Sequence, residues 1–311
     1  MDNKTMANSS APKSIRRSLL LAIPFILVYW LIRSVPVTPC DFLHKESYNL
    51  EGELDYCGPG DAEFVDLSIR KWPMNLDFKP IDKPIVGQPC RFEINIKQFD
   101  GSPLGPDDVA RSHTKKIHLM AINQSLEDYQ HLHPVADELF DGTWRFTMTP
   151  EMGGNYKVFL DFIPIRSPRR VLLASSFEVQ GQAKENIEID GNLISKIGDQ
   201  TFSLKTSGRA KIGSEISLEL NGVNQDGVPV ELTPVMGAFA HMVAFDPQLN
   251  GFAHLHPNED TLPRSLEEAH AGPLTFSFVP PREGIYRLWA QIRLKDKKGQ
   301  TFIPFNLLVD S

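Results

Sequence analysis

Short segments in which apolar and polar residues alternate dominate the chain from about residue 76 onward. Residues 92–96 alternate with a period of two, and residues 216–220 do the same, a pattern that predicts half-buried strands. Residues 116–122 are almost continuously apolar. As a strand, this segment places two sets of side chains on opposite faces, Ile117, Leu119 and Ala121 on one and His118, Met120 and Ile122 on the other. We therefore expect a protein built from short strands.

The strand pattern runs through two similar cycles. The same order of glycine, strand and turn appears in both, and the turn signal Asp100-Gly101-Ser102-Pro103 is matched by Asp226-Gly227-Val228-Pro229. Each cycle has roughly 105–110 residues and about seven short strands, which is typical of immunoglobulin-like sandwiches. The predicted fold class is all-β, with two tandem immunoglobulin-like β-sandwich domains at residues 76–180 and 200–311 and a linker at 181–199.

An apolar segment near the N-terminus departs from this pattern. Lys13, Arg16 and Arg17 precede the apolar residues 19–32, a charge arrangement that places the preceding residues in the cytoplasm. We predict a cytoplasmic tail at residues 1–17 and an N-terminal transmembrane helix, a signal-anchor, at 18–35. The run is short for a spanning helix and contains Pro24, so a cleaved signal peptide is the alternative. Both interpretations place the C-terminal body outside the cytoplasm.

A connector at residues 36–75 holds two of the three cysteines. Cys40 and Cys57 lie in a segment without periodicity, where a disulfide between them would suit an oxidising compartment and leave Cys90 over. The pairing of the three stays open. Adding His44 gives a Cys/His set for a metal, but its spacing fits no usual zinc ribbon.

The most specific signal is a duplicated histidine motif. Tyr129-Gln130-His131-Leu132-His133-Pro134 returns as Phe252-Ala253-His254-Leu255-His256-Pro257. Each copy follows a histidine in an apolar run, His118 or His241, at the same spacing. On a strand, residues i and i+2 project from the same face, so each motif presents two imidazoles together.

Pairing with the upstream strand would bring three imidazoles together in each copy. Three nitrogen ligands with an open fourth position suit Zn²⁺ or Cu²⁺. The sequence therefore predicts a copper or zinc site in each domain, whose candidate ligands are His118, His131 and His133 in the first and His241, His254 and His256 in the second. Met120 and Met242 could add a thioether for copper, although methionine in an apolar strand is more often part of a core. The structural alternative is a corner whose imidazoles bond loop carbonyls.

Composition and motifs exclude several other classes of function. A net charge of −7 without a basic stripe argues against nucleic-acid binding. His131, His133 and Glu138 invite comparison with a cupin metal motif, but Ser125 stands where the first glycine of that motif belongs, and Gly142 follows Glu138 too closely. Serine-hydrolase, zinc-protease, phosphate-loop and dinucleotide signatures do not occur. We predict that the protein is not an enzyme, and the sequence identifies no protein partner.

The repeated residues resemble a group of bacterial envelope domains. Their pattern is a His-Leu strand, a Phe-x-His-Leu-His-Pro segment and a later strand with tyrosine and a basic residue, seen here as His118-Leu119, Tyr129 to Pro134 and Tyr156-Lys157, and again as His241-Met242, Phe252 to Pro257 and Tyr286-Arg287. Tyr129 and Met242 depart from it. The resemblance implies immunoglobulin-like sandwiches associated with copper or heavy-metal handling, in a single-pass protein of the bacterial cell envelope. A structural or interaction module of the envelope, in which the motif marks only the fold, is the competing hypothesis.

Overall fold

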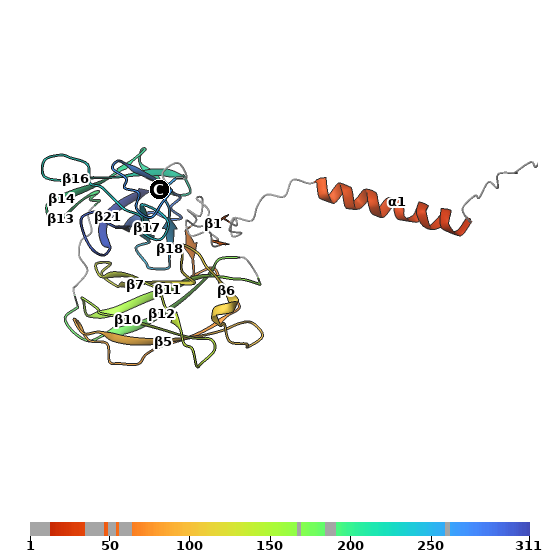
Figure 1. The fold of residues 1–311 in the computed structure, drawn as a ribbon, viewed down its shortest axis with the longest axis horizontal. Helices are drawn as coiled ribbons and strands as arrows, with labels where there is room; N and C mark the ends of the chain where they lie inside the picture. The colour runs from red at the N-terminus through yellow and green to blue at the C-terminus, as the bar shows by residue number, and fades with distance from the viewer. Residues whose placement is uncertain are drawn as a thin grey trace, which may run out of the picture. The chain divides into compact units, whose positions relative to one another are not determined.

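The computed structural model describes residues 13–34, 47–48, 54–55, 64–166, 169–183, 191–258 and 262–311. The chain divides into two compact units, Met1–Cys40 and Asp41–Ser311. The first contains the helix α1, Lys13–Ser34, which has Pro24 inside it and Arg33 in its last turn (Figure 1). Within the described ranges, no helix combines the length and the apolar character needed to cross a membrane. The described part of the predicted anchor, residues 18–34, is thus helical, and the insertion of this segment in a membrane stays a prediction.

The second unit is all-β and contains two domains, each made of two sheets. In the first β-domain, a four-stranded sheet has the order β4-β5-β10-β9 and the opposing sheet has the order β12-β11-β7-β8, with β6 paired to β11. The strands are β4 (Asn75–Pro80), β5 (Cys90–Lys97), β6 (Val109–Ala110), β7 (Ile117–Asn123), β8 (Tyr129–Leu132), β9 (Val135–Ala136), β10 (Thr143–Met148), β11 (Gly154–Pro164) and β12 (Val171–Val179), and the short helix η1 spans Pro106–Asp108.

The second β-domain repeats this arrangement. Its sheets have the orders β13-β14-β16-β19 and β15-β21-β20-β17-β18-β3. The strands are β13 (Ile194–Ile197), β14 (Gln200–Thr206), β15 (Ala210–Lys211), β16 (Ile216–Val223), β17 (Ala240–Phe245), β18 (Gly251–Leu255), β19 (Leu274–Phe278), β20 (Gly284–Ile292) and β21 (Thr301–Asp310). Strands β1 (Ser47–Tyr48) and β2 (Leu54–Asp55) form a separate pair.

One strand of the second β-domain comes from the predicted connector. Strand β3, Val65–Asp66, pairs with β18 at the edge of the six-stranded sheet. Asp66 also forms an ion pair with Arg282, which in turn pairs with Asp246. Part of residues 36–75 therefore completes the second domain, a role that no periodic pattern in that segment indicates.

Each β-domain encloses its own core between its two sheets. Ile117, Leu119 and Ala121 of β7 are fully buried in the first core, as the alternation of that strand predicts. In the second core, Ala240 and Met242 of β17 are equally buried. Burying one such aliphatic side chain stabilises the fold by about 1.5–3 kcal/mol. This burial fixes which face of β7 and β17 each histidine occupies, because the alternate residues must point the other way.

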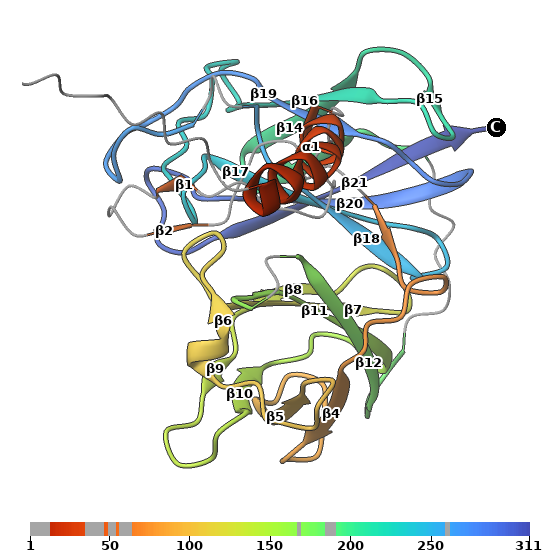
Figure 2. The same cartoon turned by 90° about the vertical axis from the view of Figure 1, so that its right-hand side faces the viewer.

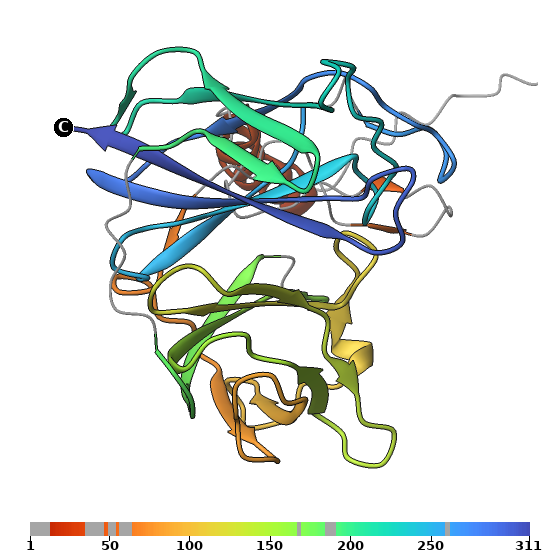
Figure 3. The ribbon, with the colours of Figure 1, turned by 90° about the vertical axis from the view of Figure 1, so that its left-hand side faces the viewer.

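The outer faces of these strands meet in a third core between the two domains. This interdomain core contains Val65, Leu172 and five residues from each repeat. The residues at equivalent positions of the two repeats are Met120 and Val243, Ile122 and Phe245, Leu126 and Leu249, Tyr129 and Phe252, and Phe159 and Trp289. The sheet bearing β7, β8 and β11 faces the sheet bearing β17, β18 and β20, as seen from two opposite sides of the molecule (Figures 2 and 3). An interface that uses the same patch of each repeat is isologous, so the domains are related by an approximate twofold axis.

Candidate metal centre

The first histidine motif lies on β8, directly beside β7. The antiparallel register pairs Met120 with His131 and Leu119 with Leu132, so the strand carrying His118 does pair with the motif. In the second repeat, β17 and β18 pair Val243 with His254 and Met242 with Leu255. The strand pairing on which the convergence of three imidazoles depends is therefore present in both copies.

The first triad of histidines forms as the sequence predicts. One ring nitrogen each of His118, His131 and His133 lies within 4.8 Å of the others. The closest approach is 3.0 Å, between Nδ1 of His118 and Nε2 of His131. Nitrogens that share a tetrahedral ion at 2.0–2.1 Å lie about 3.4 Å apart, so the triad needs only small side-chain rotations to close on one ion.

The second triad differs from the expected set. His254 and His256 group with His113 of the first β-domain within 4.8 Å, where the sequence predicts His241. The ring centre of His113 lies 4.0 Å from that of His256. His241 stays beside them, with ring centres 5.4 Å from His254 and 5.1 Å from His256. The expectation that each domain supplies a complete triad is thus wrong for the second site.

The two triads adjoin each other in one histidine cluster at the domain interface. Ring centres of His118 and His254 lie 5.9 Å apart, and those of His131 and His254 lie 5.7 Å apart. We define the histidine cluster as His113, His118, His131, His133, His241, His254 and His256. Strands β7, β8, β17 and β18 supply apolar side chains to the interdomain core and also carry four of these imidazoles, those of His118, His131, His241 and His254.

Backbone carbonyls fix the protonation of two cluster members. Nε2 of His118 lies 2.7 Å from the carbonyl oxygen of Ser112, and Nε2 of His241 lies 3.0 Å from that of Val235. A carbonyl only accepts, so both Nε2 atoms carry hydrogen and donate. In the neutral imidazoles, both Nδ1 atoms then present a lone pair toward the cluster.

Several ring nitrogens of the cluster are buried without a hydrogen-bond partner. They are Nε2 of His133, Nδ1 of His241, Nε2 of His254 and Nε2 of His256. A buried polar atom without a partner costs about 1–3 kcal/mol. Four such atoms gathered in one place are uncommon for a structural network, and they are the atoms that a metal ion would use.

Burial keeps the cluster uncharged at neutral pH. Desolvation, followed by repulsion from neighbouring imidazoles, holds the pKa values of His113 and His254 well below the usual value. Desolvation also lowers the pKa of His131 to about 3 and that of His241 to about 4. The pKa of His256 is lowered by the same cause. Because histidine binds a metal as the neutral imidazole, the cluster can bind an ion at pH 7 without first losing protons.

Residues of the opposite domain contact the outer nitrogens of the motif histidines. Nδ1 of His131 lies 2.7 Å from Oε1 of Gln291 in the second domain. For the second motif, Nδ1 of His254 lies 3.8 Å from the carboxylate of Asp161 in the first domain. Arg170 donates two hydrogen bonds of 2.9 and 2.7 Å to this carboxylate. Asp161 of β11 lies opposite His118 of β7, and Gln291 of β20 lies opposite His241 of β17. Asp161 and Gln291 therefore occupy equivalent positions in the two repeats. Such outer partners orient ligating histidines in metal sites.

The two triads differ in the space beside them. His133 lines an open pocket of about 710 Å³ together with Arg91, Glu93 and Arg145. His113, His254 and His256 instead line a small cavity of about 10 Å³ beside Asp161 and Arg170, roughly the space of one water-sized sphere. The space beside the first triad is thus much larger than the space beside the second.

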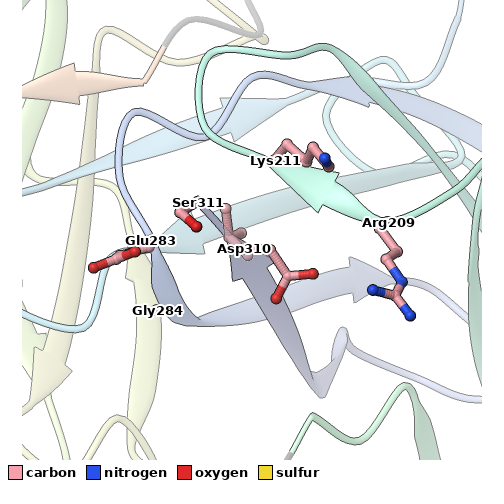
Figure 4. Close-up of a pocket in the computed structure, with 7 residues that line it drawn as sticks. Arg209, Lys211, Glu283, Gly284, Asp310 and Ser311 are labelled. Carbon is pink, nitrogen blue, oxygen red and sulfur yellow. The ribbon is translucent and has the colours of Figure 1, made fainter.

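A further surface pocket lies away from the histidines. It surrounds the end of β21 and has a volume of about 710 Å³. Figure 4 shows Arg209, Lys211, Glu283 and Asp310 around it. Charges of both signs line this pocket, and none of its lining residues belongs to the histidine cluster.

Other candidates from the sequence have structural positions. Met120 lies in the interdomain core and Met242 in the core of the second domain, so the core interpretation holds for both. Cys90 is a buried free cysteine whose Sγ donates to the carbonyl of Asp82 at 3.2 Å, and burial raises the pKa of its thiol. Cys40, His44 and Cys57 lie outside the described residues, and so does the predicted pairing of Cys40 with Cys57.

Sequence reasoning missed His113 because it has no counterpart in the second repeat. It occupies a turn between Ser112 and Lys115, where the repeat-equivalent residue is Met236. The available signal was its position five residues before His118, shortly before the strand already predicted to carry a ligand. Only the packing of the two domains reveals that the turn reaches across to the other triad.

The fold and the cluster define a protein with duplicated β-domains and an interdomain histidine cluster. The chain belongs to the family described as a domain of unknown function, DUF8832, which matches it twice, at residues 74–179 and 195–310. This match confirms the duplication predicted from the repeated motif. No curated protein matches the chain in sequence.

Solved structures add only a distant likeness. The chain is similar to the crystal structure of a protein from Corynebacterium diphtheriae that is provisionally named as membrane anchored, with 10% identity and a TM-score of 0.23. The match covers 76% of this chain and 59% of that chain. A likeness at this TM-score carries no argument about fold or function.

Proposed function

We propose that the protein binds copper or zinc ions in the histidine cluster, one ion at each triad. The observation that carries this proposal is the group of four unpartnered, buried ring nitrogens. An ion coordinated by these lone pairs would offset the desolvation cost that they carry in the metal-free protein. Three imidazole ligands at each triad match the donor sets that Zn²⁺ and Cu²⁺ accept.

The donor arrangement supports a binding role without catalysis. The second triad adjoins a cavity with space for about one water-sized sphere, which leaves no volume for an organic substrate beside an ion. Its ligands come from both domains, with His113 from the first and His254 and His256 from the second. An ion there would cross-link the domains. The first triad, reachable through the pocket at His133, is the site at which an ion would enter and leave.

The cellular setting of this proposal rests on the sequence. We place the β-domains outside the cytoplasm of a bacterium and assign them to the immunoglobulin-like type. The apolar helix α1 would hold them at the membrane, with its N-terminal end in the cytoplasm because basic residues precede its apolar run. A metal-binding protein of the envelope is the function that the cluster and this N-terminal pattern support together.

A structural module is the second candidate, and one observation favours it. If the amide of Gln291 is turned over, it donates to Nδ1 of His131, whose Nε2 then donates to Nδ1 of His118 across the 3.0 Å contact. That network satisfies His118 and His131 without metal. It leaves one buried ring nitrogen each of His133, His241, His254 and His256 without a hydrogen-bond partner, which is why we prefer the metal-binding function.

Titration of the metal-free full-length chain with Cu²⁺ and Zn²⁺ separates the two candidates. We expect two ions per chain for the unchanged protein, one for either His133→Ala or His256→Ala, and none for the double variant. His270→Ala is the matched control, because His270 also has a buried, unpartnered nitrogen but stacks on Phe239 outside the cluster. Equal binding by the unchanged protein and the double variant would exclude the proposal. The structural candidate instead predicts a loss of thermal stability in the double variant that is independent of metal.

A further inference from the structure

The turn that carries His113 recurs in the second domain with a methionine in its place. Ser112 and Lys115 exchange backbone hydrogen bonds of 2.7 and 3.0 Å, and Val235 and Ala238 exchange bonds of 2.7 and 3.2 Å. The first central residue of each turn has a left-handed backbone, with φ of +50° at His113 and +49° at Met236. These are two-residue hairpin turns of the same geometry. His113 and Met236 are therefore repeat equivalents in conformation as well as in sequence position.

Each turn is fixed to the histidine of the strand that follows it. Nε2 of His118 lies 2.7 Å from the carbonyl oxygen of Ser112, and Nε2 of His241 lies 3.0 Å from that of Val235. The side chain that projects from the turn is thus held in the same relation to its own domain in both repeats.

The side chain of His113 crosses the domain interface. Its ring centre lies 4.0 Å from that of His256 and 5.2 Å from that of His254. The approximate twofold axis applies to the surroundings of the cluster as well, since Gln291 approaches His131 and its equivalent Asp161 approaches His254. Under the same relation, the side chain of Met236 would extend in the opposite direction, toward His131 and His133.

Turn chemistry does not account for a methionine at this position. A left-handed backbone favours glycine or asparagine, and L side chains rarely adopt it. Gly237 follows Met236 with φ of +81°, so this turn already uses glycine at its other central position. Residues held in such conformations concentrate at functional sites. Met236 is half-buried, whereas Met120 and Met242 are fully buried in their cores.

The geometry points to Met236 as the fourth ligand of the first triad, which makes that triad a Cu⁺ site. Three imidazoles and one thioether form a softer donor set than the all-nitrogen set of the second triad, where His113 occupies the equivalent position. Thioethers select Cu⁺, whereas imidazole alone suits Zn²⁺ and Cu²⁺ as well. This inference rests on the proposed function, and it assigns different metals to two sites that the duplication would otherwise make equal.

Competition with a coloured Cu⁺ chelator tests the assignment in the full-length chain. Loss of an outer-shell partner alone costs about 10–100-fold in metal affinity, so Met236→Leu should weaken Cu⁺ binding at one site by at least about tenfold. Its Zn²⁺ affinity should change less than about threefold, because zinc gains little from a thioether. Met242→Leu is the control, since Met242 lies on the neighbouring strand but is buried in the second domain's core. That variant should bind both ions like the unchanged protein.

X-ray absorption of the Cu⁺-loaded chain gives a second reading. We expect a sulfur scatterer that disappears in Met236→Leu and persists in Met242→Leu. Unchanged Cu⁺ affinity in Met236→Leu, or nitrogen scatterers alone in the unchanged chain, would overturn the role of Met236 while Zn²⁺ and Cu²⁺ binding still supported the proposed function. If the unchanged chain bound none of these ions, both the proposed function and this inference would be wrong.

Discussion

His113 of the first β-domain lies against His256 of the second, with ring centres 4.0 Å apart. The two residues belong to different repeats, and His113 has no histidine counterpart. Their contact joins two triads into one cluster and makes the second triad depend on the domain interface. A duplication that could have produced two separate sites has instead produced a shared and asymmetric one.

Metal should raise the melting temperature of the chain. An ion that binds only the folded state stabilises it by about 4 kcal/mol at a free concentration one thousandfold above its Kd. If the two β-domains unfold together as one unit of more than 150 residues, that is on the order of 10 °C. Calorimetry with and without a chelator measures the shift. It should persist in His270→Ala and vanish in the double variant His133→Ala/His256→Ala. A shift that survives in the double variant would place the ion outside the cluster.

The metal-free protein should lose stability as the pH falls below about 6.5. The unfolded histidines have pKa values near 6.5, whereas burial lowers the folded pKa of His131 to about 3 and of His241 to about 4. The unfolded state therefore binds more protons in this window. Stability is complete above pH 6.5 and declines below it, by up to about 1.4 kcal/mol per pH unit for each such histidine.

Denaturant midpoints between pH 8 and pH 5, in the presence of a chelator, check this decline. The window lies well above the lowered pKa values of Asp82 and Glu93, both about 2, so these carboxylates contribute little to the change. A midpoint that stays constant from pH 8 to pH 5 would contradict the burial of neutral imidazoles.

Removing the hydroxyl of Tyr129 should stabilise the protein. This hydroxyl is buried in the interdomain core without a hydrogen-bond partner, and the equivalent residue of the second repeat is Phe252. Tyr129→Phe should raise the free energy of unfolding by up to about 1 kcal/mol. Tyr156→Phe is the matched control, because the Tyr156 hydroxyl donates to Asp128 and accepts from the backbone N–H of Met152.

That control should lower the free energy of unfolding by about 1–2 kcal/mol. Urea unfolding of both variants gives the two values. Destabilisation of similar size in both would mean that Tyr129 has a hydrogen-bond partner in solution, and the packing described for the interdomain core would need revision.

Gln291 should affect the metal affinity of the first triad but not that of the second. Its Oε1 lies 2.7 Å from Nδ1 of His131, and loss of such an outer partner lowers metal affinity by about 10–100-fold. Gln291→Ala should therefore weaken one of the two sites. Gln130→Ala serves as the control, because Gln130 neighbours His131 in sequence but bonds Asp128 and Thr149. Calorimetric titration distinguishes them, and equal effects on both sites would argue against a separate role for Gln291.

Much of the fold could be predicted from the sequence because local periodicity determines it. The alternation in residues 116–122 predicted which face of β7 enters the domain core, and Ile117, Leu119 and Ala121 lie there. The repeat of the histidine motif predicted the duplication, and the strand of His118 does pair with the first motif, which was the condition for three imidazoles to meet. These features depend on neighbours along the chain and across one hairpin.

The features that the sequence did not predict depend on distant packing. The outward apolar residues, such as Ile122 and Phe245, form a core between domains, but alternation cannot indicate what covers such a face. His113 enters the second triad only through that packing. The edge strand β3 likewise joins a sheet whose other strands begin far along the chain. Long-range contacts of this kind leave no periodic pattern in the residues that make them.

Anomalous X-ray scattering at the zinc or copper absorption edge, from crystals of the full-length chain grown with that metal, tests the central claim most directly. The account predicts two anomalous peaks inside the histidine cluster, each about 2.0–2.1 Å from imidazole nitrogens. One should lie at His118, His131 and His133, and the other at His113, His254 and His256. Absence of both peaks, with the imidazoles hydrogen-bonded to one another instead, would contradict it.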